Sequence, residues 1–325
     1  MELSRRQLLQ LAVGAAGLPA MSRSARAQTY PTRPVRVIVG FAAGGTQDIV
    51  ARLIFQWLSD RLGQQFVIEN RPGAGGNIAA AAVVRAPADG YTILLVGLSN
   101  AVNATLYDNL GYNFIRDIAP VAGIMRLPNL MAVNPSVPVR TVPEFIAYAK
   151  ANPGKVNFAS AGNGAPNHVA LELFKMMVGV DIVHVPYRGG AGAVSAAIGG
   201  HVQGLFESIP VAIEYIKADQ LRALGVSSAA RLDVLPDVPP IGDFLPGFEA
   251  SGFYGVGVPC NTPAEIIATL NGQVNAALVD AKVSARLVEL GGTVLGGSPA
   301  DFGELIVEET EKWAKVIRAT HLRAE

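Results

Sequence analysis

The stretch that decides the fold is VRVIVGFAAGGTQD, residues 35–48. Valine and isoleucine dominate its first half, which predicts a buried β-strand over residues 35–40. The two glycines and the threonine at 44–46 break that strand, and apolar residues then recur at helical spacing until Gly63. A strand, a glycine turn and a helix in this order predict a βαβ unit and a largely parallel sheet.

The same order of elements occurs twice along the chain. Gly162 lies 118 residues after Gly44, and Arg188 lies 117 residues after Arg71, and each of these residues marks a glycine-rich turn. We interpret the two sets as lobes of similar build, an internal repeat in two copies, with chance likeness between ordinary βαβ units as the alternative. The further predicted elements are strands at 65–69, 91–96, 155–160, 181–186 and 202–206, and helices at 77–85, 167–178 and 193–198.

The last part of the chain predicts a strand at 253–258 and helices at 263–278 and 299–319, each helix opened by a Thr-Pro or Ser-Pro pair. If this tail returns to the first lobe, the chain crosses between the lobes twice, near residues 126–133 and 252–256. We therefore expect lobe 1 to comprise residues 28–126 plus 254–325, and lobe 2 to comprise residues 127–253.

Residues 1–27 predict a cleavable export signal. Arg5 and Arg6 precede an apolar stretch at 8–20, and an Ala-Arg-Ala cleavage site follows at 25–27. The segment SRRQLL at residues 4–9 also resembles a twin-arginine signal. No later segment has 18 uninterrupted apolar residues. We expect a periplasmic protein that is soluble once the signal is removed.

The composition argues against several classes of function. Lys plus Arg and Asp plus Glu are equal at 26 each, so no basic excess favours nucleic acid. A single cysteine excludes an intrachain disulfide, and the four histidines are too scattered for a metal motif. A two-glycine fragment at 162–164 lacks the third glycine of a dinucleotide fingerprint. We expect no metal, no cofactor and no catalytic residues.

The candidate binding site lies where the strands end. In an open parallel sheet, ligands bind outside the carboxyl ends of the strands, and helix N-termini there attract anions. Glycine turns let a ligand approach the backbone, and short polar side chains can bind carboxylate or hydroxyl oxygens. N-capping alone is the alternative for Thr46 and Ser160, and a structural role is the alternative for His168. The candidates are Gly44, Gly45, Thr46, Ser99, Asn100, Ser160, Gly162, Asn163, Asn167 and His168.

Several segments together resemble the Bug-type extracytoplasmic solute receptors of tripartite tricarboxylate transporters. The resemblance spans almost the whole mature chain. It is carried by YP at 30–31, RP at 33–34, FAAGGTQD at 41–48, VIENRPGAGGN at 67–77, DGYT at 89–92, ASAGNG at 159–164, VHVPYR at 183–188 and LPDVP at 235–239.

This resemblance implies an α/β type II periplasmic-binding-protein fold, with two βα lobes, a central cleft and two crossover segments. It implies a small carboxylate ligand, held by the first loop partly through ordered waters and by the second-lobe loop and helix start. The expected partners are the membrane components of a tripartite transporter, or a sensor. By motif match the binding role falls on Phe41, Ala42, Gly44, Gly45, Thr46 and Asp48, on Ser160, Ala161, Gly162, Asn163, Ala165, Asn167 and His168, and on Glu207 and Ser208.

Three departures from the family pattern bear on the choice of ligand. Ala43 stands where the family usually has proline, and Ala165 and Pro166 stand where it usually has a hydroxyl residue. Glu207 stands where the family often has aspartate, so a longer acid could shrink the pocket or contact an amino group. The alternative function is an exported hydrolase acting on a small carboxylate ester, with Ser160 as nucleophile and His168 as base.

Overall fold

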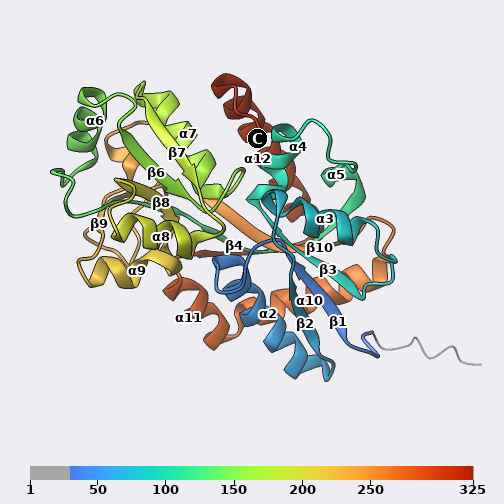
Figure 1. Ribbon diagram of the computed structural model, residues 1–325. Helices are drawn as coiled ribbons and strands as arrows, with labels where there is room; N and C mark the ends of the chain where they lie inside the picture. The colour runs from blue at the N-terminus through green and yellow to red at the C-terminus, as the bar shows by residue number, and fades with distance from the viewer. Residues whose placement is uncertain (1–29, 325) are drawn as a thin grey trace, which may run out of the picture.

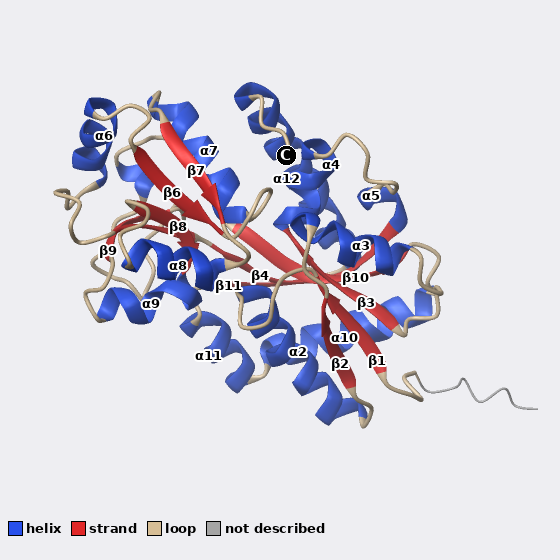
Figure 2. Ribbon diagram, viewed as in Figure 1, coloured by secondary structure: helices blue, strands red, loops and turns tan. Residues whose placement is uncertain are grey.

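The chain folds around two β-sheets with helices on both faces of each (Figures 1 and 2). The computed structural model describes residues 30–324, so the signal peptide expected at residues 1–27 lies outside the described residues. The α/β architecture expected from the alternating strands and helices is present in both halves.

The first sheet has the strand order β11-β4-β10-β3-β1-β2. Its first three strands along the chain are parallel neighbours, whereas β10 runs antiparallel between β3 and β4. Since β10 and β11 come from the last part of the chain, the tail does return to this sheet. The strands are β1 (Val35–Val39), β2 (Phe66–Asn70), β3 (Thr92–Gly97), β4 (Ile118–Leu127), β10 (Gly252–Pro259) and β11 (Thr293–Gly296).

The second sheet has the order β7-β6-β8-β5-β9. Here β6 is parallel to β7 and β8, and β5 runs antiparallel between β8 and β9. Three parallel strands followed by one antiparallel strand repeat the arrangement of the first sheet, which is the structural counterpart of the repeated glycine turns. The strands are β5 (Asn129–Val133), β6 (Val156–Ser160), β7 (Ile182–Pro186), β8 (Gly204–Ser208) and β9 (Arg222–Val226).

The helices follow the strands closely. Several helices were not predicted, among them α4, α6, α9 and α11. Helix α4 begins directly after β3 and places Ser99 and Asn100 in a helical turn. The Asn100 side chain accepts a hydrogen bond from the Gly97 N–H at 3.0 Å, which stabilises that start. The helices are α2 (Thr46–Leu62), η1 (Ala74–Gly76), α3 (Asn77–Val84), α4 (Leu98–Leu106), α5 (Phe114–Asp117), α6 (Val142–Ala151), α7 (Pro166–Val178), α8 (Gly190–Ile198), α9 (Ile209–Lys217), η2 (Ile241–Asp243), α10 (Ala264–Val279), α11 (Ala281–Glu289) and α12 (Pro299–Thr320).

Strand β1 explains why both faces of the first sheet are covered. Val37 and Val39 pack with α2, α10 and α11, whereas Ile38 packs on the opposite face with α3 and α4. Side chains alternate between the faces of a strand, so a run of apolar residues is buried only when helices cover both sides. The core on the Ile38 face continues into the second half through Phe158 and the fully buried Trp313.

The two sheets are joined at crossovers that run side by side. Only Pro128 separates β4 from β5, and the Ala250 carbonyl, just before β10, accepts hydrogen bonds from Asn129 at 2.9 Å and Ser227 at 3.0 Å. These bonds tie the outgoing chain to the returning chain. The second crossover therefore leaves the second sheet beside the point where the first enters it.

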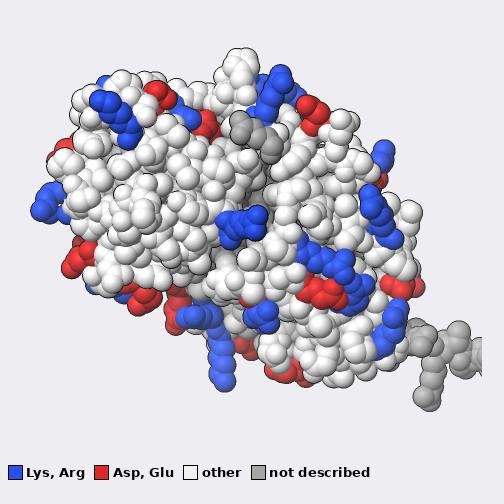
Figure 3. All heavy atoms as spheres, in the orientation of Figure 1, with Lys and Arg blue, Asp and Glu red and all other residues white. Residues whose placement is uncertain are grey.

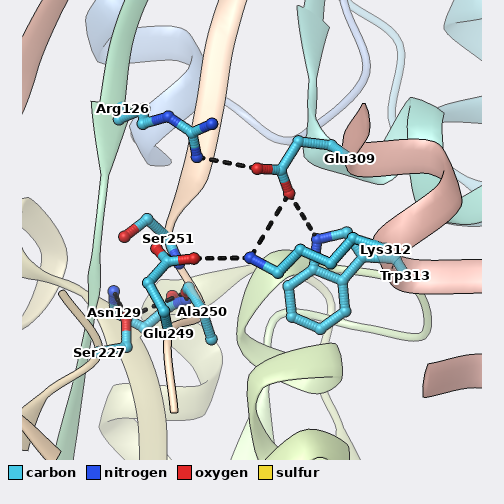
Figure 4. Close-up of polar contacts among 9 residues, drawn as sticks. All are labelled: Arg126, Asn129, Ser227, Glu249, Ala250, Ser251, Glu309, Lys312 and Trp313. Carbon is cyan, nitrogen blue, oxygen red and sulfur yellow. Dashed lines mark hydrogen bonds and ion pairs between the residues drawn. The ribbon is translucent and has the colours of Figure 1, made fainter. Parts of the chain in front are cut away.

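Helix α12 anchors both crossovers through a group of polar residues, here called the crossover cluster: Arg126, Glu249, Glu309, Lys312 and Trp313 (Figure 4). Glu309 accepts hydrogen bonds from Arg126 Nη1 and from Trp313 Nε1, both at 2.9 Å. Lys312 binds Glu249 at 2.6 Å. Because α12 also packs on α4 and α7, the last helix connects the two halves of the molecule.

Two further features concern the surface. Among residues 30–324, no helix is both long enough and apolar enough to cross a membrane. The single cysteine, Cys260, is exposed directly after β10, and its N–H donates to the Asp117 carbonyl at 3.0 Å.

Candidate functional site

A cavity of about 200 Å³ lies between the two sheets, and the first turns of four helices form much of its wall. Helix α2 follows β1 along the chain, α7 follows β6, α8 follows β7 and α9 follows β8. The cavity is therefore at the carboxyl ends of these strands, where open parallel sheets bind ligands. Its lining residues are Phe41, Ala42, Ala43, Gly45, Thr46, Gln47, Asn129, Ala161, Ala165, Pro166, Asn167, Arg188, Gly189, Gly190, Ala191, Glu207, Ser208, Val211 and Tyr254.

Helix starts make this wall attractive to negative charge. The N–H groups of a first turn have no carbonyl partner within the helix, and the helix dipole places partial positive charge there. At α2, the N–H groups of Thr46 and Gln47 belong to this class, and both residues line the cavity. The start of α8 requires glycine, because Gly189 has a φ of 103°.

The two sides of the cavity touch across the cleft. Thr46 Oγ1 and Ser208 Oγ share a hydrogen bond of 2.6 Å, although 162 residues separate them in sequence. A furrow runs between the two halves of the visible face, and a basic side chain lies over it (Figure 3). The direct contact indicates that this arrangement of the lobes is a closed one.

Glu207, the next-to-last residue of β8, contributes a buried carboxylate to the wall. Its Oε1 accepts hydrogen bonds from the N–H and the hydroxyl of Ser208, both at 2.8 Å, and its Oε2 accepts one from Asn167 Nδ2 at 3.1 Å. Burial raises the pKa of Glu207 above its usual value, and these three bonds only partly oppose that shift. Burial and the nearby Glu207 charge also raise the pKa of Tyr254, so its hydroxyl stays protonated.

Nine of the residues expected from the sequence line the cavity. They come from the first loop and α2, from the β6–α7 loop, and from the end of β8, and so from both halves of the molecule. They are Phe41, Ala42, Gly45, Thr46, Ala161, Ala165, Asn167, Glu207 and Ser208.

On the first-lobe side, four expected residues, Gly44, Asp48, Ser99 and Asn100, do not line the cavity. The N–H of Gly44 donates to Asp48 Oδ2 at 3.0 Å, and Arg52 binds the same oxygen at 2.9 Å. Burial raises the pKa of Asp48, but the bonds from Arg52 and Gly44 outweigh it and hold the pKa below its usual value. Ser99 and Asn100 are buried in the first turn of α4. Gly44 and Asp48 thus bond to each other within the first loop and the start of α2, whereas Ser99 and Asn100 belong to the start of α4.

On the second-lobe side, Ser160, Gly162, Asn163 and His168 also lie outside the wall. Ser160 Oγ hydrogen-bonds to His184 Nε2 at 2.5 Å, and the His168 ring stacks on His184 with centroids 3.7 Å apart. Burial lowers the pKa of His168 to about 2 and that of His184 to about 4, so both rings are neutral at pH 7.

This geometry corrects the pairing assumed for the hydrolase alternative. Ser160 is bonded to His184 and not to His168, whose Nδ1 instead accepts the Gly164 N–H at 3.1 Å. Ser160 is also fully buried and does not line the cavity. Both histidines hold the turn after β6 in shape.

Ten further lining residues were not among the predicted binding residues, although Ala43 and Gln47 lie in the segment 41–48 that carries the family resemblance. Four of the ten, Arg188, Gly189, Gly190 and Ala191, belong to the repeated glycine turn at 188–192, which the sequence marks as a repeat but not as part of the site. Asn129 and Tyr254 come from the crossover strands, and no local pattern marks them as facing the cleft. The others are Ala43, Gln47, Pro166 and Val211.

No metal site is found in the described part of the chain, where no three His, Cys, Asp or Glu side chains gather closely enough to hold an ion. The polar groups that face the cavity are amides, hydroxyls, one guanidinium and one carboxyl group. Such a wall can bind and orient a small polar molecule.

Known proteins are similar to this chain in sequence and in fold. A family model for tripartite tricarboxylate transporter family receptors matches residues 50–322. BugT of Bordetella pertussis is 36% identical over 297 residues, which cover 90% of this chain and 91% of BugT.

Two solved structures from Rhodopseudomonas palustris are close in fold. Rpa4515 with adipate is 38% identical with a TM-score of 0.87, over 90% of this chain and 99% of that one. MatC with bound malate is 33% identical with a TM-score of 0.84, over 89% of this chain and 100% of MatC. The expected two-lobed periplasmic-binding-protein fold is confirmed. With its family model matched over residues 50–322, this chain belongs to the tripartite tricarboxylate transporter receptor family.

Proposed function

We propose that this protein is a periplasmic receptor that captures a small carboxylate-bearing molecule between its lobes and performs no chemistry on it. The loaded receptor would deliver the molecule to the membrane components of a tripartite transporter. The export signal expected at residues 1–27 supports the periplasmic location.

One observation carries the proposal: four helix N-termini from two separate lobes converge on one cavity. Main-chain donors and helix dipoles at such ends bind anions without an ion-pairing side chain. Relatives solved with adipate and with malate support a carboxylate as the anion.

The nine lining residues expected from the sequence are proposed as ligand contacts, together with Gln47, Gly190 and Arg188. Gly44, Asp48, Ser99 and Asn100 would act by holding the first loop, and Ser160, Gly162, Asn163 and His168 by holding the second. The Thr46–Ser208 hydrogen bond would form when the lobes close over the ligand.

Native mass spectrometry of the protein purified from its own cells tests the proposal directly. We expect one small carboxylic acid per chain, which rebinds after removal with a stoichiometry of one in a calorimetric titration. The ligand should be recovered unchanged after prolonged incubation, because the cavity offers no paired nucleophile and base. Conversion of the ligand would favour an enzyme instead.

The Gly45→Val variant supplies a matched test of the site. A branched side chain at this cavity-lining residue would block approach to the α2 start, so binding should fall by at least about tenfold. Gly63→Asn, at the other end of the same helix, is the control, because asparagine tolerates the left-handed φ of 66° found there. Equal binding by both variants would contradict the proposed contact at α2.

A further inference from the structure

Glu207 is a buried acid without a cation. Its side chain is 4% exposed, and its three hydrogen-bond donors, two from Ser208 and one from Asn167, are all neutral. Among residues 30–324, no Lys, Arg or His side chain forms an ion pair with it. An isolated buried charge is unfavourable unless a partner compensates it.

The carboxylate also keeps a free acceptor position on the cavity side. A carboxylate offers about four lone-pair sites, two on each oxygen. Both sites of Oε1 are taken by Ser208, whereas Oε2 accepts only the bond from Asn167. Because Glu207 and Asn167 both line the cavity, a donor on a bound molecule can reach the remaining site.

Glu207 also lies beside the starts of two helices, α8 and α9. It accepts the N–H of Ser208, the residue that caps α9, and a Cβ built on Gly190 in the first turn of α8 would lie 2.7 Å from Oε2. These two helix ends therefore already face a carboxylate that belongs to the protein. The starts of α2 and α7 remain for the carboxylate of a ligand.

The cavity wall thus combines main-chain donors at the starts of α2 and α7 with the Glu207 carboxylate, and Asn167 and Ser208 link the two kinds of group. We infer that this receptor selects molecules with one carboxylate and one ammonium group, and that Glu207 is the residue that selects against dicarboxylates. The inference rests on the proposed function, because it assumes that a carboxylate enters this cavity. Arg188, which lines the cavity and is otherwise exposed, can attract the carboxylate that both kinds of molecule carry, and its charge by itself favours the dicarboxylate.

Calorimetric titration of the whole protein at pH 7.5 with two matched pairs of acids tests the inference. The pairs are adipate with 6-aminohexanoate and succinate with 4-aminobutanoate, so that chain length is varied separately from charge. In each pair whose chain length fits the cavity, the amino acid should bind at least about tenfold more tightly than the dicarboxylate. Tighter binding of the dicarboxylate would overturn the inference.

Three variants assign the selectivity to its residue. Glu207→Gln should remove the preference for the amino acid and strengthen dicarboxylate binding by about tenfold, whereas Glu207→Asp should keep the preference. Arg188→Gln should weaken both members of a pair, and the dicarboxylate at least as much as the amino acid, so it should not remove the preference for the amino acid. Circular dichroism and melting curves establish that each variant is folded. Loss of dicarboxylate binding in Glu207→Gln would mean that a protonated Glu207 donates to the ligand, and would overturn the inference.

The outcome also separates this inference from the proposed function. If a carboxylate binds in the cavity but the preference does not depend on Glu207, only the inference fails. If none of the four acids binds and the protein from its own cells carries no carboxylic acid, the proposed function fails, and the inference fails with it.

Discussion

Two buried glutamates in this molecule have opposite surroundings. Glu309 in the crossover cluster and Glu207 in the cavity are each 4% exposed. Glu309 is bound by the Arg126 guanidinium and the Trp313 indole, and Lys312 lies 3.9 Å away. Glu207 is bound only by neutral groups of Ser208 and Asn167.

The difference separates a structural acid from a binding acid. A carboxylate whose cations come from the protein is satisfied before any ligand arrives, so it can fix the geometry of the crossovers. A carboxylate without a protein cation is satisfied only when a molecule from outside supplies one. Burial is the same in the two cases, and the origin of the partner distinguishes them.

The largest effect on stability is expected from removing the Glu309 carboxylate, whose partners come from the protein. Glu309→Ala leaves the Arg126 charge and the Trp313 N–H without their partner, so the free energy of unfolding should fall by about 3 kcal/mol. This is the low end for a buried pair, because the Arg126 side chain is 33% exposed. Urea unfolding measures it, with the exposed Glu308→Ala on the same helix as the control. A loss equal to that of the control would mean that the cluster is not stabilising.

A smaller effect is expected from a substitution that displaces the Glu207 carboxylate. In Gly190→Ala, the new Cβ would lie 2.7 Å from Glu207 Oε2, so the carboxylate must move away from Asn167. Ligand affinity should fall by about tenfold, which corresponds to about 1.4 kcal/mol. Gly272→Ala in α10 is the matched control, because a Cβ there meets nothing within 4 Å. Unchanged affinity in Gly190→Ala would show that Glu207 can move at no cost.

The two regions should also respond to pH in opposite directions. Burial raises the pKa of Glu207 above 4.5, so as the pH falls the folded state binds a proton before the unfolded state does. Wild type should therefore gain stability relative to Glu207→Gln as the pH falls toward 4.5. Burial also acts on Glu249, but Lys312 and Ser251 outweigh it and lower its pKa. Wild type should therefore lose stability relative to Glu249→Gln as the pH falls from 4.5 through that lowered pKa. Unfolding curves between pH 3 and pH 8 measure both differences, and parallel trends would contradict the comparison.

The smallest effect is expected at the edge of the crossover cluster. Lys312 and Glu249 have side chains that are 35% and 34% exposed, so solvent screens their ion pair. Lys312→Met should lower the free energy of unfolding by only about 0.5 kcal/mol, and less in 1 M salt. A loss as large as that of Glu309→Ala would mean that the cluster acts as one unit.

Much of the fold could be predicted because its signals are local. The predicted strand at 35–40 is observed at Val35–Val39, and the predicted helix at 167–178 begins one residue earlier, at Pro166. Periodicity and glycine turns suffice for such elements. Helix α4 was missed, because its short polar first turn at Ser99 and Asn100 resembles a loop until the bond to the Gly97 N–H is known.

The site could be predicted only in part, because side-chain direction depends on distant partners. Thr46 faces the cavity and meets Ser208, whereas Asp48, two residues later, is turned back toward Arg52. His168 follows Asn167 directly, but stacking on His184 keeps it out of the wall. Of these partners only Arg52 is near in sequence. The motif therefore identifies the loop but not which of its side chains line the cavity.

The exposed Cys260 has a practical consequence. It is the only thiol in the sequence and follows the last residue of β10, six residues after the cavity-lining Tyr254. At about 3.3 Å per residue, a maleimide dye on this thiol would be roughly 20 Å from the cavity wall along the strand. The native chain could therefore be labelled or immobilised at a single position, with its binding cleft left open, as the sensing element of an optical detector.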